Sequence, residues 1–163
     1  MLQAKKNNLM VQMLIVLVFG VIFIFSSRYA GEVVLANNGL GFDGKHYAQL
    51  ASDFPNNITK AQDTKYFQRS APAFIVYIVS KMLSVEPSNK NLIFLFSCLN
   101  LIFLLLSVFG WHRVSEVSGF NNFSNWLGFA ALFLNFASLK FPFYYPILTD
   151  AMGFTLAIFL LLF

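Results

Sequence analysis

The sequence predicts an all-α, polytopic integral membrane protein with about four transmembrane helices and interfacial helices in the first outer loop. One observation is composition: 58% of the 163 residues are hydrophobic and only 11% are charged, whereas an average soluble domain is about 25% charged. The other is that apolar runs of nearly membrane-spanning length recur along the chain, separated by polar segments. We treat residues 1–163 as a single membrane domain.

Four apolar runs are predicted to span the membrane, over residues 9–25, 92–109, 123–139 and 147–163. Gly110 is predicted to end the second span, and Trp126 is placed as an interfacial anchor near the start of the third. Asn100 and Asn135 lie within spans, where hydrogen bonds between helices would satisfy their amides. The last run is still apolar at Phe163, so we expect the N-terminal part of a longer protein.

The segment 26–91 is predicted to be an outer loop with two interfacial helices. The first covers about 43–54 and is ended by Pro55; the stretch from 56 to 69 is expected to be irregular. The second covers about 71–85, with Ser70 as a possible N-cap. About 15 residues form a helix of roughly 22 Å, which is shorter than the roughly 30 Å hydrocarbon core. This favours an interfacial helix, and a tilted span remains the alternative.

The orientation follows from counting crossings. If 71–85 does not cross, two spans separate Asp43 from Asp150, and both acids face the same side. Lys5 and Lys6 favour a cytoplasmic N-terminus, which puts the 26–91 loop outside. Eight of the 11 Lys and Arg residues then lie outside, against the positive-inside rule. Charge alone would favour the reverse orientation, so the outer cations need a function.

Asp43, His46 and Tyr47 are the first candidate site. They follow one another at helical positions i, i+3 and i+4, so a helix starting at Asp43 carries them on one face. A carboxylate held there at a membrane surface could act as a general base. The alternative is a helix-capping aspartate, with Tyr47 anchored among lipid headgroups.

Asp150, Arg69 and Lys65 are further candidates. A carboxylate at the start of an apolar run is costly unless it is hydrated or paired, although the positive end of a helix also favours it there. Arg69 and Lys65 precede the second interfacial helix and could bind a phosphate. Contact with lipid headgroups is the alternative for these cations.

Several classes of function are not indicated by the sequence. It has no glycine-rich phosphate loop, no metal-binding Cys/His spacing and no Ser/His/Asp pattern, and the lone Cys98 cannot form an internal disulfide. No basic run is interleaved with aromatic residues, so no nucleic-acid partner is expected.

Three motifs, in order, resemble those of one enzyme family. They are Phe42-Asp43-Gly44-Lys45-His46-Tyr47 in the first loop, Arg69-Ser70-Ala71-Pro72-Ala73-Phe74 opening the second interfacial helix, and Phe143 to Asp150 entering the last span. The chain resembles the type-C glycosyltransferases, most closely bacterial relatives of the mannosyltransferases of GPI-anchor assembly. Phe42 stands where that group has a tryptophan.

The resemblance implies a hexosyl- or pentosyltransferase of the bacterial plasma membrane and cell envelope. The donor would be a polyprenyl-phosphate sugar and the acceptor a glycan, lipid or protein on the outer face. Asp43 would be catalytic, and Arg69, Lys65, His46, Tyr47 and Asp150 would bind substrate. A divalent cation is a possible cofactor, with Asp43 and Asp150 as its candidate ligands. The alternatives are a non-catalytic subunit, a flippase-like lipid- or glycan-binding protein, or an inactive fragment.

Overall fold

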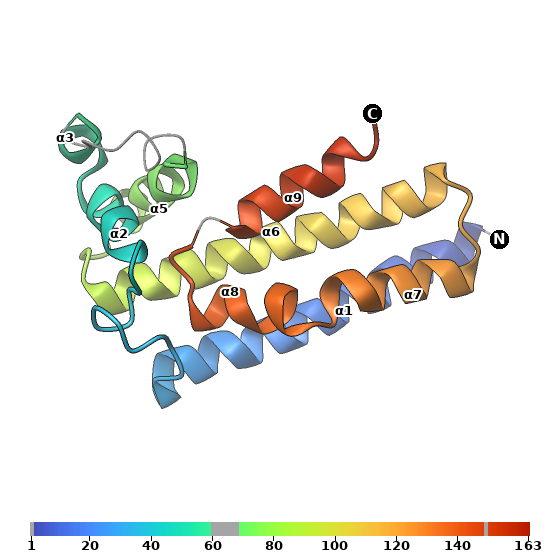
Figure 1. The fold of residues 1–163 in the computed structure, drawn as a ribbon, viewed down its shortest axis with the longest axis horizontal. Coiled ribbons are helices and arrows are strands. Elements are labelled where there is room, and N and C mark those ends of the chain that lie inside the picture. The colour runs from blue at the N-terminus through green and yellow to red at the C-terminus, as the bar shows by residue number, and fades with distance from the viewer. Residues whose placement is uncertain (1, 60–68, 149) are drawn as a thin grey trace.

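The computed structural model describes residues 2–59, 69–148 and 150–163. Every regular element within those ranges is helical, in agreement with the predicted fold class. Lys65, a predicted phosphate ligand, lies outside the described residues. The long helices α1 and α6 run side by side with α7, and helices α2, α3 and α5 gather at one end of them (Figure 1). We call this the site end.

Helix α1 covers Leu2–Phe25 and continues through a π-helical turn, Ser26–Ala30. The sequence predicted that the span would give way to polar loop at Ser26. The chain instead stays helical there, and the Ser27 hydroxyl donates to the carbonyl of Ile24 at 3.1 Å. The helical stretch ends at Gly31, whose φ of 68° is readily adopted by glycine.

Helices α2, Gly44–Ser52, and α3, Phe54–Ile58, take the place of the predicted helix over 43–54. The extended backbone of Asp53 (φ −153°, ψ 77°) separates them. Pro55 was predicted to end the first helix, and this is wrong. It lies in the first turn of α3, where its missing N–H would have had no partner within the helix.

Helix α5, Ala71–Met82, is the second predicted interfacial helix. Its 12 residues correspond to about 18 Å, too short to cross a hydrocarbon core of about 30 Å. The predicted Ser70 cap is absent, because the Ser70 side chain makes no capping hydrogen bond.

Helix α6, Asn89–Val117, is 29 residues long, so the predicted end at Gly110 is also wrong. Gly110 lies inside the helix, where a Cβ atom would come within 3.0 Å of Ile158 Cγ2. The glycine therefore allows close packing against α9 rather than ending α6.

The predicted third span is broken. Helix α7 covers Asn122–Phe133, and after a break the chain forms a π-helical turn, Phe136–Lys140, and α8, Phe141–Tyr144. The two pieces are bent by 63°. Asn135 was predicted to bond to another helix, but it bridges the break instead. Its amide donates to the Ala131 carbonyl at 2.9 Å and its oxygen accepts from the Ser138 N–H at 3.0 Å.

Asn100 does bond between helices, as predicted. Its Nδ2 donates to the carbonyls of Pro142 at 2.7 Å and Pro146 at 2.8 Å. In a continuous helix the Pro142 carbonyl would accept from the N–H of residue 146, which a proline lacks. The Asn100 amide supplies that missing donor and fixes the turn that leads to α9.

Helix α9 covers Asp150–Leu160, shorter than the predicted span over 147–163. Its 11 residues correspond to about 16 Å. Two helical stretches, Asn8–Ala30 and Asn89–Val117, are long and apolar enough to cross a membrane, or three if the bent α7–α8 pair counts as one span. This apolar character indicates a membrane protein, with fewer candidate spans than the four predicted.

Two apolar cores hold the helices together. One lies along α1, α6, α7 and α9, around Val16, Leu104 and Phe129. The other joins α2 and α5 to the start of α6, around Tyr47 and Phe96. The second core anchors the site end to the long helices, because Ile147, just before α9, is also fully buried in it.

Candidate functional site

Helix α2 presents the first predicted motif at the site end. Asp43 occupies the position before its first residue, but the carboxylate makes no capping hydrogen bond to the helix. The alternative prediction, that Asp43 caps the helix, therefore has no supporting side-chain hydrogen bond. Asp43 and His46 are exposed to solvent, whereas Tyr47 is only 3% exposed and packs in the core beneath α2. The three predicted neighbours therefore differ in exposure, with only the tyrosine ring in the core.

Tyr145 connects the first motif to the third. Its hydroxyl accepts a hydrogen bond from the backbone N–H of Asp43 at 3.1 Å. The ring lies against Gly41, where a Cβ atom would be 1.9 Å from Tyr145 Cε2. Gly41 also has a φ of 76°, which side-chain-bearing residues rarely adopt. Residues separated by 102 positions in the chain thus fix the backbone at Asp43.

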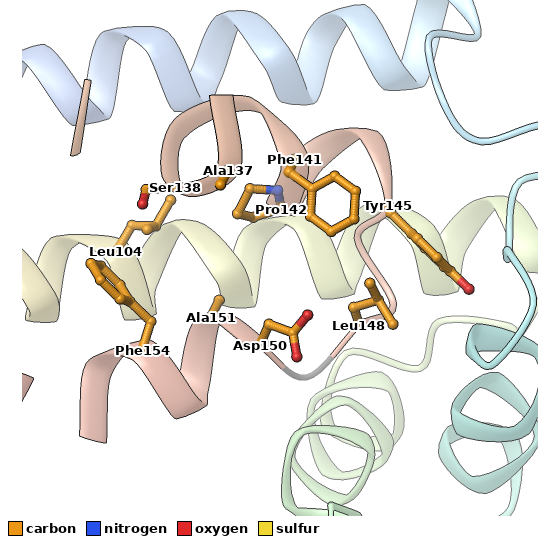
Figure 2. Close-up of a pocket in the computed structure, with 10 residues that line it drawn as sticks. All are labelled: Leu104, Ala137, Ser138, Phe141, Pro142, Tyr145, Leu148, Asp150, Ala151 and Phe154. Carbon is orange, nitrogen blue, oxygen red and sulfur yellow. The ribbon is translucent and has the colours of Figure 1, made fainter. Parts of the chain in front are cut away.

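A pocket of about 310 Å³ lies between α8 and α9. Figure 2 shows Tyr145 and Asp150 on its rim, with the Tyr145 hydroxyl pointing away from the pocket. The rest of the lining is mainly apolar, including Phe141, Leu148 and Phe154. The pocket can therefore hold an apolar group beside a carboxylate.

A second cavity, of about 420 Å³, contains Arg69 together with Asp150. We call it the Arg69–Asp150 groove. Its lining comes from Arg69 and the first turn of α5 on one side and from the first turns of α9 on the other: Ala71, Pro72, Met152, Gly153 and Leu156. Both charged side chains are exposed, and within the described part of the chain no ion pair joins them. A cation and a carboxylate thus share an open groove with apolar walls.

The predicted site residues are brought together to different degrees. Arg69 and Asp150 line one groove, and Asp150 shares a pocket with Tyr145, which contacts Asp43. Asp43 and Asp150 therefore lie at the same end of the bundle. Among the described residues, no group of three or more His, Cys, Asp and Glu side chains could hold a metal ion. These residues thus give no ligand set for the possible divalent cation.

Two residues were missed as part of the site by sequence reasoning. Tyr145 lies inside the third motif but was given no role, and Gly41 lies directly before the first motif. The signal for Gly41 was its place in Gly39-Leu40-Gly41, two glycines close to an acidic residue. The contact between Gly41 and Tyr145 depends on the fold and has no local signature.

Comparisons with protein-family models, curated proteins and solved structures give no match. Function must therefore be inferred from the geometry and chemistry of the site itself.

Proposed function

We propose that the protein is a multi-pass glycosyltransferase of a bacterial plasma membrane. It transfers a hexose or pentose from a polyprenyl-phosphate donor to a glycan, lipid or protein acceptor on the outer face. The observation that carries this proposal is the convergence of three motifs, around Asp43, Arg69 and Asp150, at one end of the helical bundle.

The Arg69–Asp150 groove has the chemistry that a lipid-phosphate donor needs. The guanidinium of Arg69 can pair with a phosphate through two parallel hydrogen bonds. Met152 and Leu156 supply apolar wall for the first part of a polyprenyl chain. No nucleotide fold is needed, because the bilayer delivers the donor laterally.

The transfer needs a base and a stabilised leaving group. In the proposed reaction, the Asp43 carboxylate takes the proton of the acceptor hydroxyl, and that oxygen attacks the anomeric carbon of the sugar. The bond from the anomeric carbon to the phosphate oxygen breaks, and its electron pair leaves with the lipid phosphate. Arg69 stabilises that negative charge, and Asp150 orients the acceptor.

Asp43→Asn in the full-length protein tests the proposal. Asparagine keeps the size of the side chain but cannot take a proton, so sugar transfer should fall by about 10²–10⁴-fold while folding and donor binding are retained. Asp53→Asn is the matched control, since Asp53 flanks the other end of α2 and its carboxylate accepts a hydrogen bond from Asn56 at 2.7 Å. It should transfer like the wild type. Near wild-type turnover for Asp43→Asn would favour a non-catalytic lipid-binding protein instead.

A further inference from the structure

A separate cationic pocket lies where α1 ends and α6 begins. Its volume is about 290 Å³, close to the smallest ligand pockets of proteins. Two cations line it, Arg28 from the π-helical turn after α1 and Lys90 from the first turn of α6. We call it the Arg28–Lys90 pocket. It shares no lining residue with the Arg69–Asp150 groove.

The lining of this pocket favours an anion. Besides the two cations it consists of small, polar and apolar residues, none of them acidic: Ser27, Gly31, Val33, Asn38, Asn89, Ile93 and Phe94. The first turn of α6 contains no acidic residue either. The partial positive charge at the N-terminus of this 29-residue helix is therefore not offset by an acidic side chain in its first turn.

Arg28 is held in position by the protein. One guanidinium nitrogen donates to the backbone carbonyl of Lys90 at 2.9 Å, and the guanidinium carbon lies 5.5 Å from the centre of the Phe94 ring. This leaves most of its five N–H donors available to a ligand. The arrangement is pre-organised, so less side-chain entropy is lost on binding.

The nearest acidic side chain along the chain from this pocket is occupied elsewhere. Glu32 follows Gly31, but its carboxylate pairs with Lys140 and accepts a hydrogen bond from Ser26 at 2.6 Å. It is not among the residues lining the pocket. Glu32 therefore does not compete with an anionic ligand for the two cations.

The position of the pocket indicates where the anion comes from. Arg28 and Lys90 lie at adjoining ends of the two helical stretches that are long enough to cross a membrane. Further toward the middle of the same two stretches, apolar side chains are exposed, including Ile22, 53% exposed, and Phe94, 40% exposed. Basic pockets between transmembrane helices bind anionic lipid headgroups in other membrane proteins, and the same chemistry is available here.

We propose that the Arg28–Lys90 pocket binds the phosphate of an anionic membrane phospholipid, with the acyl chains lying along the exposed apolar faces of α1 and α6. This lipid is distinct from the sugar donor. It holds the end of α1 against the start of α6 and so stabilises the site end.

Lipid binding to the purified full-length protein tests this proposal. Native mass spectrometry in a zwitterionic detergent would compare short-chain phosphatidylglycerol, phosphatidylcholine with the same chains, and inorganic phosphate. Wild type should bind phosphatidylglycerol in preference to both. Arg28→Gln combined with Lys90→Gln should weaken this binding by about 30-fold, as expected for two cations near a membrane surface.

Control variants separate charge from folding. Lys81→Gln removes an exposed cation of α5 outside the pocket and should bind like wild type. Lys90→Glu leaves the backbone carbonyl that holds Arg28 and should still abolish the preference for phosphatidylglycerol. Equal affinity for phosphatidylcholine, or unchanged binding in the double variant, would overturn the proposal. Inorganic phosphate binding as tightly as the lipid would show that the pocket takes free phosphate and would overturn the assignment to lipid.

Discussion

Two groups of polar side chains, one at each end of the helical bundle, lie in opposite environments. At the site end, Asp43, Arg69 and Asp150 are exposed, and the last two line the groove. Toward the other end, Gln12 and His112 are buried, and both have side-chain nitrogens without a hydrogen-bond partner in the described part of the chain. Exposed charge can meet a ligand without a large desolvation cost, whereas a buried polar atom without a partner lowers stability.

Exposed charges therefore mark the candidate site, whereas the buried unpaired polar atoms mark imperfect packing. Two glycines with positive φ show a similar contrast. Gly41 at the site end and Gly119 at the other end both have positive φ, 76° and 67°, but only Gly41 is packed against a side chain, that of Tyr145. Backbone conformation and tertiary contact therefore act together at Gly41.

Gly41→Ala should have the largest effect on stability. The new Cβ would overlap the Tyr145 ring at 1.9 Å and would also strain a φ of 76°. Strain and overpacking each cost about 1–3 kcal/mol. Gly119→Ala has the same strain and nothing within 4 Å, so it should lose only the strain energy. Free energies of unfolding in detergent would measure both, and equal losses would mean that Tyr145 is not packed on Gly41.

Arg69→Gln should weaken donor binding by about 10–100-fold, because a hydrogen bond to a charged group contributes about 1.5–3 kcal/mol. The matched control at the other end is Arg113→Gln. Arg113 is already paired with Glu116 at 2.8 Å, so its loss should leave donor affinity unchanged. Titration with a short-chain polyprenyl phosphate would measure this. Equal affinities for the two variants would remove Arg69 from the proposed phosphate site.

Gln12→Leu should stabilise the protein by about 1–3 kcal/mol. Gln12 is fully buried, and neither polar atom of its amide has a partner within the described residues. Leucine fills a similar volume without a desolvation cost. Gln49→Leu, at an exposed position of α2, should change the unfolding free energy by less than about 0.5 kcal/mol. A destabilised Gln12→Leu variant would show that the amide is needed where it lies.

The smallest effect should be a pH dependence from Glu32. The hydrogen bond from Lys140 lowers the pKa of this carboxyl most, followed by the bond from Ser26 and the charge of Lys140. Because the folded pKa lies below its ordinary value of 4.5, the contribution to stability is complete above that value and is lost as the pH falls through the folded pKa. Glu32→Gln should flatten melting temperature against pH in this acidic window. An unchanged profile would contradict the ion pair.

The presence of the helices was predicted better than the residues at which they begin and end. Apolar runs are a strong local signal, so the all-helical fold and α5 as a short apolar helix follow from the sequence. The break at Asn135 depends on the bonds of its side chain, which donates to the Ala131 carbonyl and accepts from the Ser138 N–H. The passage of α6 through Gly110 depends on the α9 side chains that pack against this glycine. No local pattern predicts either.

The candidate site shows the same limit. Asp43, Arg69 and Asp150 could be chosen from residue type and motif order. The contact between Asp43 and Tyr145, and the burial of Tyr47, depend on how α2 packs on α6 and on the turn before α9. Helical spacing alone put Tyr47 beside Asp43 and His46, because it fixes relative position along a helix but not which face is buried.

The most direct test is to measure which side of the membrane each end of the helical bundle faces. Single-cysteine variants Ser52→Cys, Asp150→Cys and Ser118→Cys, in a Cys98→Ser background, would be labelled in intact cells with an impermeant thiol reagent. Residues 52 and 150 should be labelled from the outer face, and residue 118 should be labelled only after the membrane is permeabilised. Labelling of residues 52 and 150 from opposite faces would contradict the shared site.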